Sequence, residues 1–149
     1  MPGYDFGAGN AGTYGIYRLR RQERKNCYFV CCDIKSLIPI NEISFKAGDL
    51  SILESLNRMN NAAGQDDVVF RIGGDEFCML TASEDAAYAE KIAEEIRSHN
   101  KETFDYEGMA IPLSLYVTTT KIDSSHNLKY DQLFATLHET IRDYKPEVK

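Results

Sequence analysis

The sequence lacks the features that would place the chain in a membrane or outside the cell. No apolar run approaches the roughly 20 residues that a membrane-spanning helix needs. The first twenty residues are polar and glycine-rich and end in arginines, a pattern unlike that of a signal peptide. We therefore expect a cytoplasmic protein with no direct membrane insertion.

Cysteine and histidine are also scarce. The four cysteines form no Cys-x-x-Cys pair, and three of them lie in one apolar stretch, which predicts buried reduced thiols instead of disulfides or a zinc site. The three histidines are scattered without ligand spacing, so we expect them at the surface. These residues are Cys27, Cys31, Cys32, Cys78, His99, His126 and His138.

Positive charge is limited as well. The net charge is -6, and the basic residues gather only at Arg18-Leu19-Arg20-Arg21 and the nearby Arg24-Lys25. This balance argues against a protein that holds duplex nucleic acid through many phosphate contacts. An acidic chain can still bind a nucleotide when a divalent cation mediates the contact.

The remaining composition is typical of a soluble globular protein. Hydrophobic residues make up 43% and charged residues 27% of 149 residues, enough for one domain with its own core. We expect a glycine-rich lead-in and a short basic helix over residues 1–26, with loop through residue 15 and helix from Ile16 to Arg24. Residues 27–149 are expected to form the single domain.

Apolar patterning within the domain predicts an α+β, or mixed α/β, fold whose helices cover a mostly antiparallel sheet. The apolar run from Cys27 to Cys32 ends at Asp33 and indicates a central strand buried on both faces. Residues 68–72 and 77–80 flank Gly-Gly-Asp-Glu and predict a hairpin whose glycines take positive φ angles. A later strand is expected over residues 111–119.

Helices are predicted between these strands. They span residues 36–45, 48 to about 60, where Asn60, Asn61 and Gly64 end the segment, and 83–99. Ser83 is the expected N-cap of the third, with Glu84 and Asp85 in its first turn. A final amphipathic helix is indicated by the spacing of Leu133, Leu137, Ile141 and Tyr144.

Three acids stand where chemistry could occur. Asp33 ends the buried strand, and Asp75 and Glu76 lie at the hairpin turn. If the hairpin pairs beside the first strand, the three carboxylates converge, and hard oxygen ligands of this kind suit Mg²⁺ or Mn²⁺. Such ions can hold a triphosphate and stabilise a departing pyrophosphate. The alternative is an ordinary exposed turn whose acids face water.

A second motif points to a different activity. Gly7 to Gly12 read Gly-x-Gly-x-x-Gly, and Asp33 follows 21 residues later, near the acidic position of a dinucleotide-binding fold. That mechanism needs a strand before the glycines, and only six residues precede them. The spacing therefore disfavours a dinucleotide site.

Arg71 to Phe77 read Arg-Ile-Gly-Gly-Asp-Glu-Phe, which resembles the signature of the GGDEF domain family, the diguanylate cyclases. Further similarity lies in Asp33-Ile34-Lys35, Asn41, Gly48-Asp49 and Ser114, and Tyr14 to Arg18 faintly resembles the family's opening segment. The resemblance implies a palm-like sheet shared with nucleotide cyclases. It also implies condensation of two GTP molecules into cyclic di-GMP and pyrophosphate by a homodimer, commonly under the control of a sensory domain.

The resemblance also implies roles for individual residues. Asp33, Asp75 and Glu76 would be catalytic and, with the Ile34 carbonyl, would bind Mg²⁺ or Mn²⁺. GTP would be held by the residues Asn41, Asp49, Gly73, Gly74 and Lys145. The family's Arg-x-x-Asp product-inhibition site survives only as Asp67, because Gly64 stands at the arginine position.

Several positions depart from the family pattern. Leu37-Ile38 replaces a Phe-Lys pair whose lysine helps to hold phosphate, Phe45-Lys46 replaces Gly-His, and Tyr116 replaces a glycine. The final helix lacks the usual Ala-Leu-Tyr-x-Ala-Lys pattern, although Lys145 falls at its lysine. Fewer cations around a triphosphate mean weaker binding. A degenerate domain that senses GTP or mediates association is therefore the alternative to a working cyclase.

Overall fold

A four-stranded antiparallel sheet forms the centre of the computed structural model, which describes residues 6–35 and 37–147. The strand order is β2-β3-β1-β6. These strands are β1 (Cys27–Ile34), β2 (Val68–Arg71), β3 (Glu76–Leu80) and β6 (Leu115–Ile122). A separate two-stranded hairpin contains β4 (Thr103–Tyr106) and β5 (Met109–Pro112).

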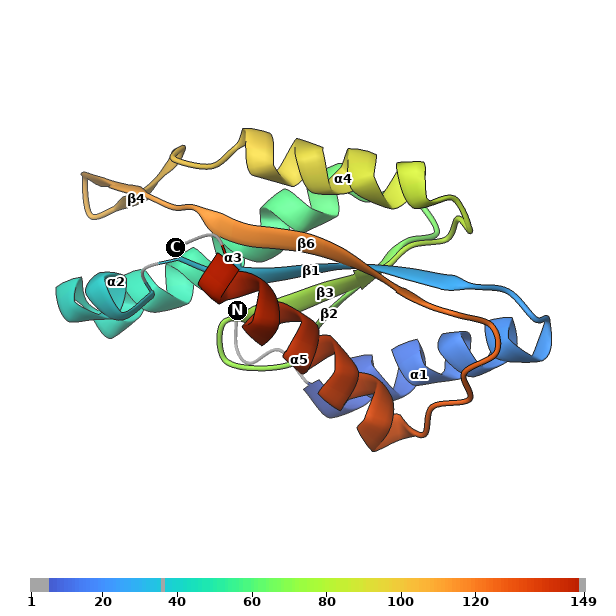
Figure 1. Ribbon diagram of the computed structural model, residues 1–149. Coiled ribbons are helices and arrows are strands. Elements are labelled where there is room, and N and C mark those ends of the chain that lie inside the picture. The colour runs from blue at the N-terminus through green and yellow to red at the C-terminus, as the bar shows by residue number, and fades with distance from the viewer. Residues whose placement is uncertain (1–5, 36, 148–149) are drawn as a thin grey trace.

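Five helices complete the described chain and cover both faces of the sheet (Figure 1). Helices α3 and α4 pack on one face, and α1 and α5 pack on the other. The helices are α1 (Phe6–Gln22), α2 (Leu37–Ile43), α3 (Phe45–Ala62), α4 (Ala86–Ser98) and α5 (Tyr130–Glu147). The predicted α+β fold with an antiparallel sheet flanked by helices is confirmed.

Strand β1 is central and buried on both faces, as its apolar run predicts. Val30 and Cys32 face the core under α3 and α4, whereas Phe29 and Cys31 face the core under α1 and α5. This alternation places successive side chains on opposite faces of the sheet. All four cysteines are buried and free, which confirms the prediction of reduced thiols.

Helix α1 corrects the prediction for the amino-terminal segment. The described part of the expected loop is helical from Phe6, and residues 1–5 lie outside the described residues. Tyr17 is fully buried, and the Tyr14 hydroxyl donates to the Leu128 carbonyl at 3.0 Å. Because this packing overrides the low helix propensity of glycine, the Gly-x-Gly-x-x-Gly residues lie inside a helix. They form no strand-to-helix loop, so the dinucleotide interpretation is wrong.

The β4–β5 hairpin was not predicted, and it interrupts the strand expected over residues 111–119. Glu107 and Gly108 have φ angles of 50° and 84° and form the turn between the two strands. Two consecutive positive φ angles match the right-handed twist of a tight hairpin. Beyond Pro112 the chain leaves this hairpin at Leu113 and Ser114 and joins the central sheet at Leu115.

Three local predictions are also corrected. Neither Gly73 nor Gly74 has a positive φ angle. Asp85, and not Ser83, is the N-cap of α4, because its side chain accepts from the Ala87 amide at 3.0 Å. Helix α3 begins three residues earlier than predicted, where the Ser44 hydroxyl caps it, and continues through Asn60 and Asn61. Both side-chain caps satisfy amides that the first helical turn leaves unpaired.

Candidate metal and nucleotide site

The three acids were expected to converge if the hairpin pairs beside the first strand, and the register of the sheet shows this pairing. Asp33 pairs directly with Glu76, so the end of β1 lies beside the start of β3. The Ile34 amide donates to the Asp75 carbonyl at 3.1 Å, which fixes the turn residue at the same edge. We name Asp33, Asp75 and Glu76 the acidic cluster.

The turn that carries Asp75 and Glu76 is held by Arg71, a residue of the motif whose role the sequence did not reveal. Its guanidinium donates to the carbonyls of Gly73, at 2.9 Å, and Gly74 and stacks over the Phe77 ring. A side chain at Gly73 would place its Cβ 2.6 Å from a Glu76 carboxylate oxygen. Any other residue at position 73 would thus require the Glu76 carboxylate to move, although the φ angle there does not demand glycine.

Asp33 is the most buried member of the acidic cluster, with a side chain only 1% exposed. Burial raises its pKa to about 7, Lys145 opposes this effect, and nearby Asp75 adds to it. One carboxylate oxygen of Asp33 accepts from the Lys145 ammonium at 2.9 Å. Within the described chain, the other oxygen is buried without a hydrogen-bond partner.

Helix α5 supplies a second partner that sequence reasoning missed. His138 lies 2.8 Å from Glu76 through its Nδ1 atom, and it is exposed, as expected for the histidines. His138 and Lys145 are seven residues apart, which places them on one face of an α-helix. That spacing was the available signal. Asp33, at the end of β1, and Glu76, at the start of β3, therefore each contact a side-chain nitrogen of α5.

The ring of Tyr116 contacts two lysines at the site. Tyr116 pairs with Asp33 across the sheet, and its ring lies 4.9 Å from the Lys35 ammonium and 5.8 Å from that of Lys145. Such cation–π contacts restrain flexible lysines. Tyr116, which departs from the family pattern, thus helps to hold Lys145 against Asp33.

The donor chemistry of the acidic cluster suits a hard divalent cation, and the unpaired Asp33 oxygen offers a ready ligand. In the described residues, however, no three His, Cys, Asp or Glu side chains are grouped closely enough to hold an ion as they stand. Lys145 occupies the other oxygen of Asp33, and His138 occupies one oxygen of Glu76. A cation would therefore compete with α5 for Asp33 and Glu76.

Two of the residues expected to hold GTP, Asn41 and Asp49, come together on α2 and α3. Asn41 is half-buried on α2, and Asp49 is exposed in the first turns of α3. Between them lies Gly48, where an added Cβ would be only 1.8 Å from the Asn41 amide oxygen. This close approach places Asn41 directly beside the Gly48-Asp49 pair.

Asp67, the surviving residue of the inhibitory motif, has a structural role. Its carboxylate accepts from the Gly64 amide at 2.6 Å, the Ala82 amide at 2.7 Å and the Tyr88 hydroxyl at 2.6 Å. The last of these bonds raises the pKa of Tyr88 to about 12. The Asp67 carboxylate thus links the residues before β2 to those after β3 instead of facing solvent.

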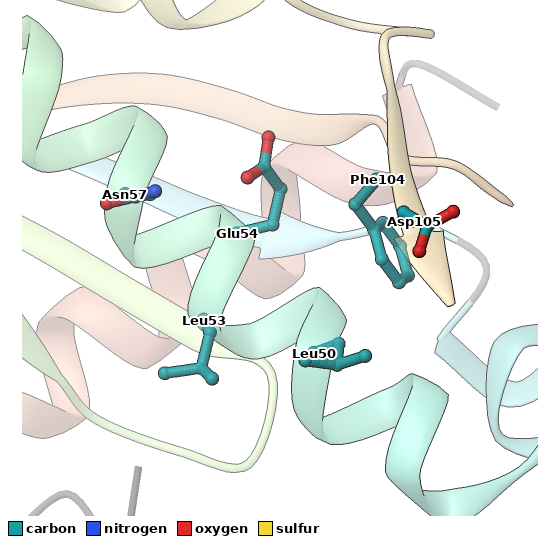
Figure 2. Close-up of a pocket in the computed structure, with 6 residues that line it drawn as sticks. All are labelled: Leu50, Leu53, Glu54, Asn57, Phe104 and Asp105. Atoms are coloured by element: carbon teal, nitrogen blue, oxygen red, sulfur yellow. The ribbon is translucent and has the colours of Figure 1, made fainter. Parts of the chain in front are cut away.

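A pocket of about 340 Å³ lies between α3 and β4 (Figure 2). Its lining includes Phe104, Asp105 and Glu54, and none of the predicted site residues. Glu54 already pairs with Arg58 at 3.0 Å, and Asp105 accepts from the Gly108 amide at 3.4 Å. Its acids are thus engaged within the protein.

The fold and the site together define the class to which this protein belongs. Members of this class are α+β domains in which a Gly-Gly-Asp-Glu-Phe hairpin places acids beside the end of a central strand. A family model described as diguanylate cyclase, GGDEF domain, matches residues 14–149. The chain belongs to the GGDEF domain family.

Solved GGDEF domains share the fold. The GGDEF domain of YfiN from Pseudomonas aeruginosa is 21% identical with a TM-score of 0.79, over 93% of this chain and 81% of that one. That of DgcB from Caulobacter crescentus, solved with c-di-GMP, is 15% identical with a TM-score of 0.76, over 93% and 80%.

A longer relative shows the same arrangement. SiaD of P. aeruginosa, solved with its activator SiaC, is 17% identical with a TM-score of 0.79 over 93% of this chain. The match covers 55% of SiaD, so this chain spans about half of that protein. A search of curated proteins found no matching sequence. No helix in the described chain is both long and apolar enough to cross a membrane.

Proposed function

We propose that this domain is a diguanylate cyclase that condenses two GTP molecules into cyclic di-GMP and two pyrophosphates. The observation that carries the proposal is the acidic cluster, with an unpaired, buried Asp33 oxygen beside Glu76. The reaction would occur in a homodimer in the cytoplasm, under a sensory domain. Its substrate-reading residues are Asn41 and Asp49.

GGDEF cyclase domains are generally metal-dependent, and Asp33, Asp75, Glu76 and the Ile34 carbonyl would hold Mg²⁺ or Mn²⁺ here. The bound ion would neutralise phosphate charge and activate the attacking hydroxyl. The protein's own contribution is positioning. Asn41 and Asp49 orient the base, and Gly73 and Gly74 leave room for the phosphates. The Lys145 ammonium moves from Asp33 to the phosphates and binds their negative charge.

The second candidate is a GTP-sensing or dimerising module without turnover. The observation that favours it is the engagement of Asp33 and Glu76 by Lys145 and His138. Chromatography of products formed from GTP with Mg²⁺ or Mn²⁺, at high protein concentration, separates the candidates. Cyclic di-GMP supports the cyclase. Bound GTP without product would favour the module.

Replacing Lys145 by Met tests whether α5 competes with a cation for Asp33. Removing a positive charge next to the carboxylate should tighten Mn²⁺ binding in the absence of nucleotide by roughly tenfold. Isothermal titration of Mn²⁺ into both proteins measures this change. Lys121→Met removes an exposed lysine elsewhere and should leave Mn²⁺ affinity unchanged. Equal affinity in Lys145→Met would show that Asp33 is no ligand.

Replacing Gly48 by Ala tests the base-reading pair. The new methyl group would force the Asn41 amide away, so GTP affinity should fall by about tenfold, the value of one hydrogen bond. Fold stability should not fall, because alanine favours a helix by up to about 1 kcal/mol over glycine. Gly15→Ala, another helical glycine with open space around it, is the control. Unchanged GTP binding in Gly48→Ala would remove Asn41 from the site.

A further inference from the structure

The basic segment at the end of α1 contains arginines with different surroundings. Arg20 is structural, because its guanidinium donates to the Thr81 carbonyl beyond β3. Arg18 and Arg21 instead line a pocket of about 230 Å³ together with Gln22 and Asn127. This pocket belongs to α1 and to the loop before α5, and it includes no residue of the acidic cluster.

Helix α1 supplies three of the four described lining residues, all on one face. Positions 18, 21 and 22 follow the i, i+3, i+4 spacing at which side chains on an α-helix become neighbours. Arg18 and Gln22 are exposed, and Arg21 is half-buried. The two guanidiniums are therefore presented together at the mouth of the pocket.

Asn127 is fixed opposite this face by contacts on either side of it in the chain. The Tyr17 hydroxyl donates to the His126 carbonyl at 3.4 Å and accepts from the Leu128 amide at 3.2 Å. Earlier in the same loop, the Ser124 amide donates to the Asn26 side chain at 2.7 Å. Figure 1 shows this loop, between β6 and α5, running alongside α1. The pocket is thus held open by the fold.

Each lining residue that the structure describes can donate hydrogen bonds, and none of these residues carries a carboxylate. Among the described residues, no acid forms a salt bridge with Arg18 or Arg21. Within the residues that the structure describes, the Nε atom of Arg21 is buried and has no hydrogen-bond partner. Two guanidiniums at one pocket that pair with no acid among the described residues are suited to an anion, in a protein whose net charge is -6.

We propose that Arg18, Arg21, Gln22 and Asn127 form a binding site for a phosphate-bearing anion, separate from the acidic cluster. Forked guanidinium donors match the geometry of phosphate oxygens, and two amide side chains can complete their hydrogen bonding. The pocket volume lies below the roughly 300–1,000 Å³ typical of drug-sized ligands. It therefore suits a single phosphoryl group, either free or on the headgroup of a lipid.

Calorimetric titration with inorganic phosphate, in EDTA to keep cations from the acidic cluster, tests this site. Saturable binding is expected, and Arg18→Ala and Arg21→Ala should each weaken it by roughly tenfold or more. Arg24→Ala removes a nearby exposed charge outside the pocket and should change affinity by less than about twofold. Arg21 is half-buried, so replacing it also changes packing within the fold. Arg18→Glu, at an exposed position, changes the charge of the pocket without this effect.

Vesicles of phosphatidylcholine with and without phosphatidic acid distinguish the two sources of phosphate. Binding to phosphatidic acid vesicles that Arg18→Glu abolishes assigns the site to a lipid headgroup. Phosphate binding without vesicle binding assigns it to a soluble phosphorylated ligand. The proposal is overturned if neither probe binds, or if Arg24→Ala weakens binding as much as the pocket variants do.

Discussion

Glu76→Gln is expected to abolish cyclic di-GMP formation while leaving the fold intact. The amide keeps the shape of the side chain, and its oxygen can still accept from His138, now 2.8 Å away. It loses the negative charge that a divalent cation requires. Since such an ion contributes several kcal/mol of transition-state stabilisation, the rate should fall by about 100-fold or more.

The measurement is product formation from GTP with Mg²⁺ or Mn²⁺, alongside circular dichroism for the fold. Glu139→Gln, at an exposed position one residue beyond His138 on α5, is the matched control and should retain full activity. A Glu76→Gln protein that still makes cyclic di-GMP at the original rate would show that the acidic cluster is not the metal site. This result would remove the main support for the proposed reaction.

Arg58→Ala should cause the largest loss of stability. Arg58 is only 5% exposed, and its guanidinium donates to the Leu113 carbonyl at 2.7 Å and the Glu102 carbonyl at 2.9 Å, and pairs with Glu54. It thereby joins α3 to both ends of the β4–β5 hairpin. Losing three charge-assisted bonds should lower the free energy of unfolding by about 3 kcal/mol.

Chemical denaturation measures the change, and the melting temperature should fall by roughly 10 °C. Arg142→Ala, which removes an arginine from the surface of α5, should cost less than about 0.5 kcal/mol. Arg58→Lys should recover only part of the loss, because an ammonium lacks the forked donors. If Arg58→Ala unfolds like the native chain, the two carbonyl bonds contribute nothing to stability.

The site could be predicted from the sequence where its residues lie close together in the chain or on paired strands. The apolar run ending at Asp33 predicted a buried strand, and the Gly-Gly-Asp-Glu turn predicted a hairpin, whereas pairing between the two was only a condition of the argument. Pairing of Asp33 with Glu76 then brings the acids together. Asn41 and the Gly48-Asp49 pair were indicated by the family resemblance alone, and only the structure brings Asn41 beside Gly48.

Features that depend on distant contacts escaped prediction. His138 is 62 residues from Glu76, and its seven-residue spacing from Lys145 shows only that the two share a face of α5, not which residues that face contacts. Glu107 and Gly108 form a hairpin turn with positive φ angles. The hairpin was missed because Glu-Gly is a weaker sequence signal for such a turn than Asn-Gly. Helix α1 forms because Tyr17 is buried against the rest of the domain, which local helix propensity does not encode.

The burial of Tyr17 also bears on how this chain can be shortened. Tyr17 belongs to the same apolar cluster as Phe29 of β1 and Leu133 and Leu137 of α5. A version starting at Cys27 would remove that ring and leave the apolar side chains beneath it open to water. Exposed apolar surface of this kind promotes association between molecules. Expression boundaries for this domain therefore belong before Phe6, with the whole of α1 retained.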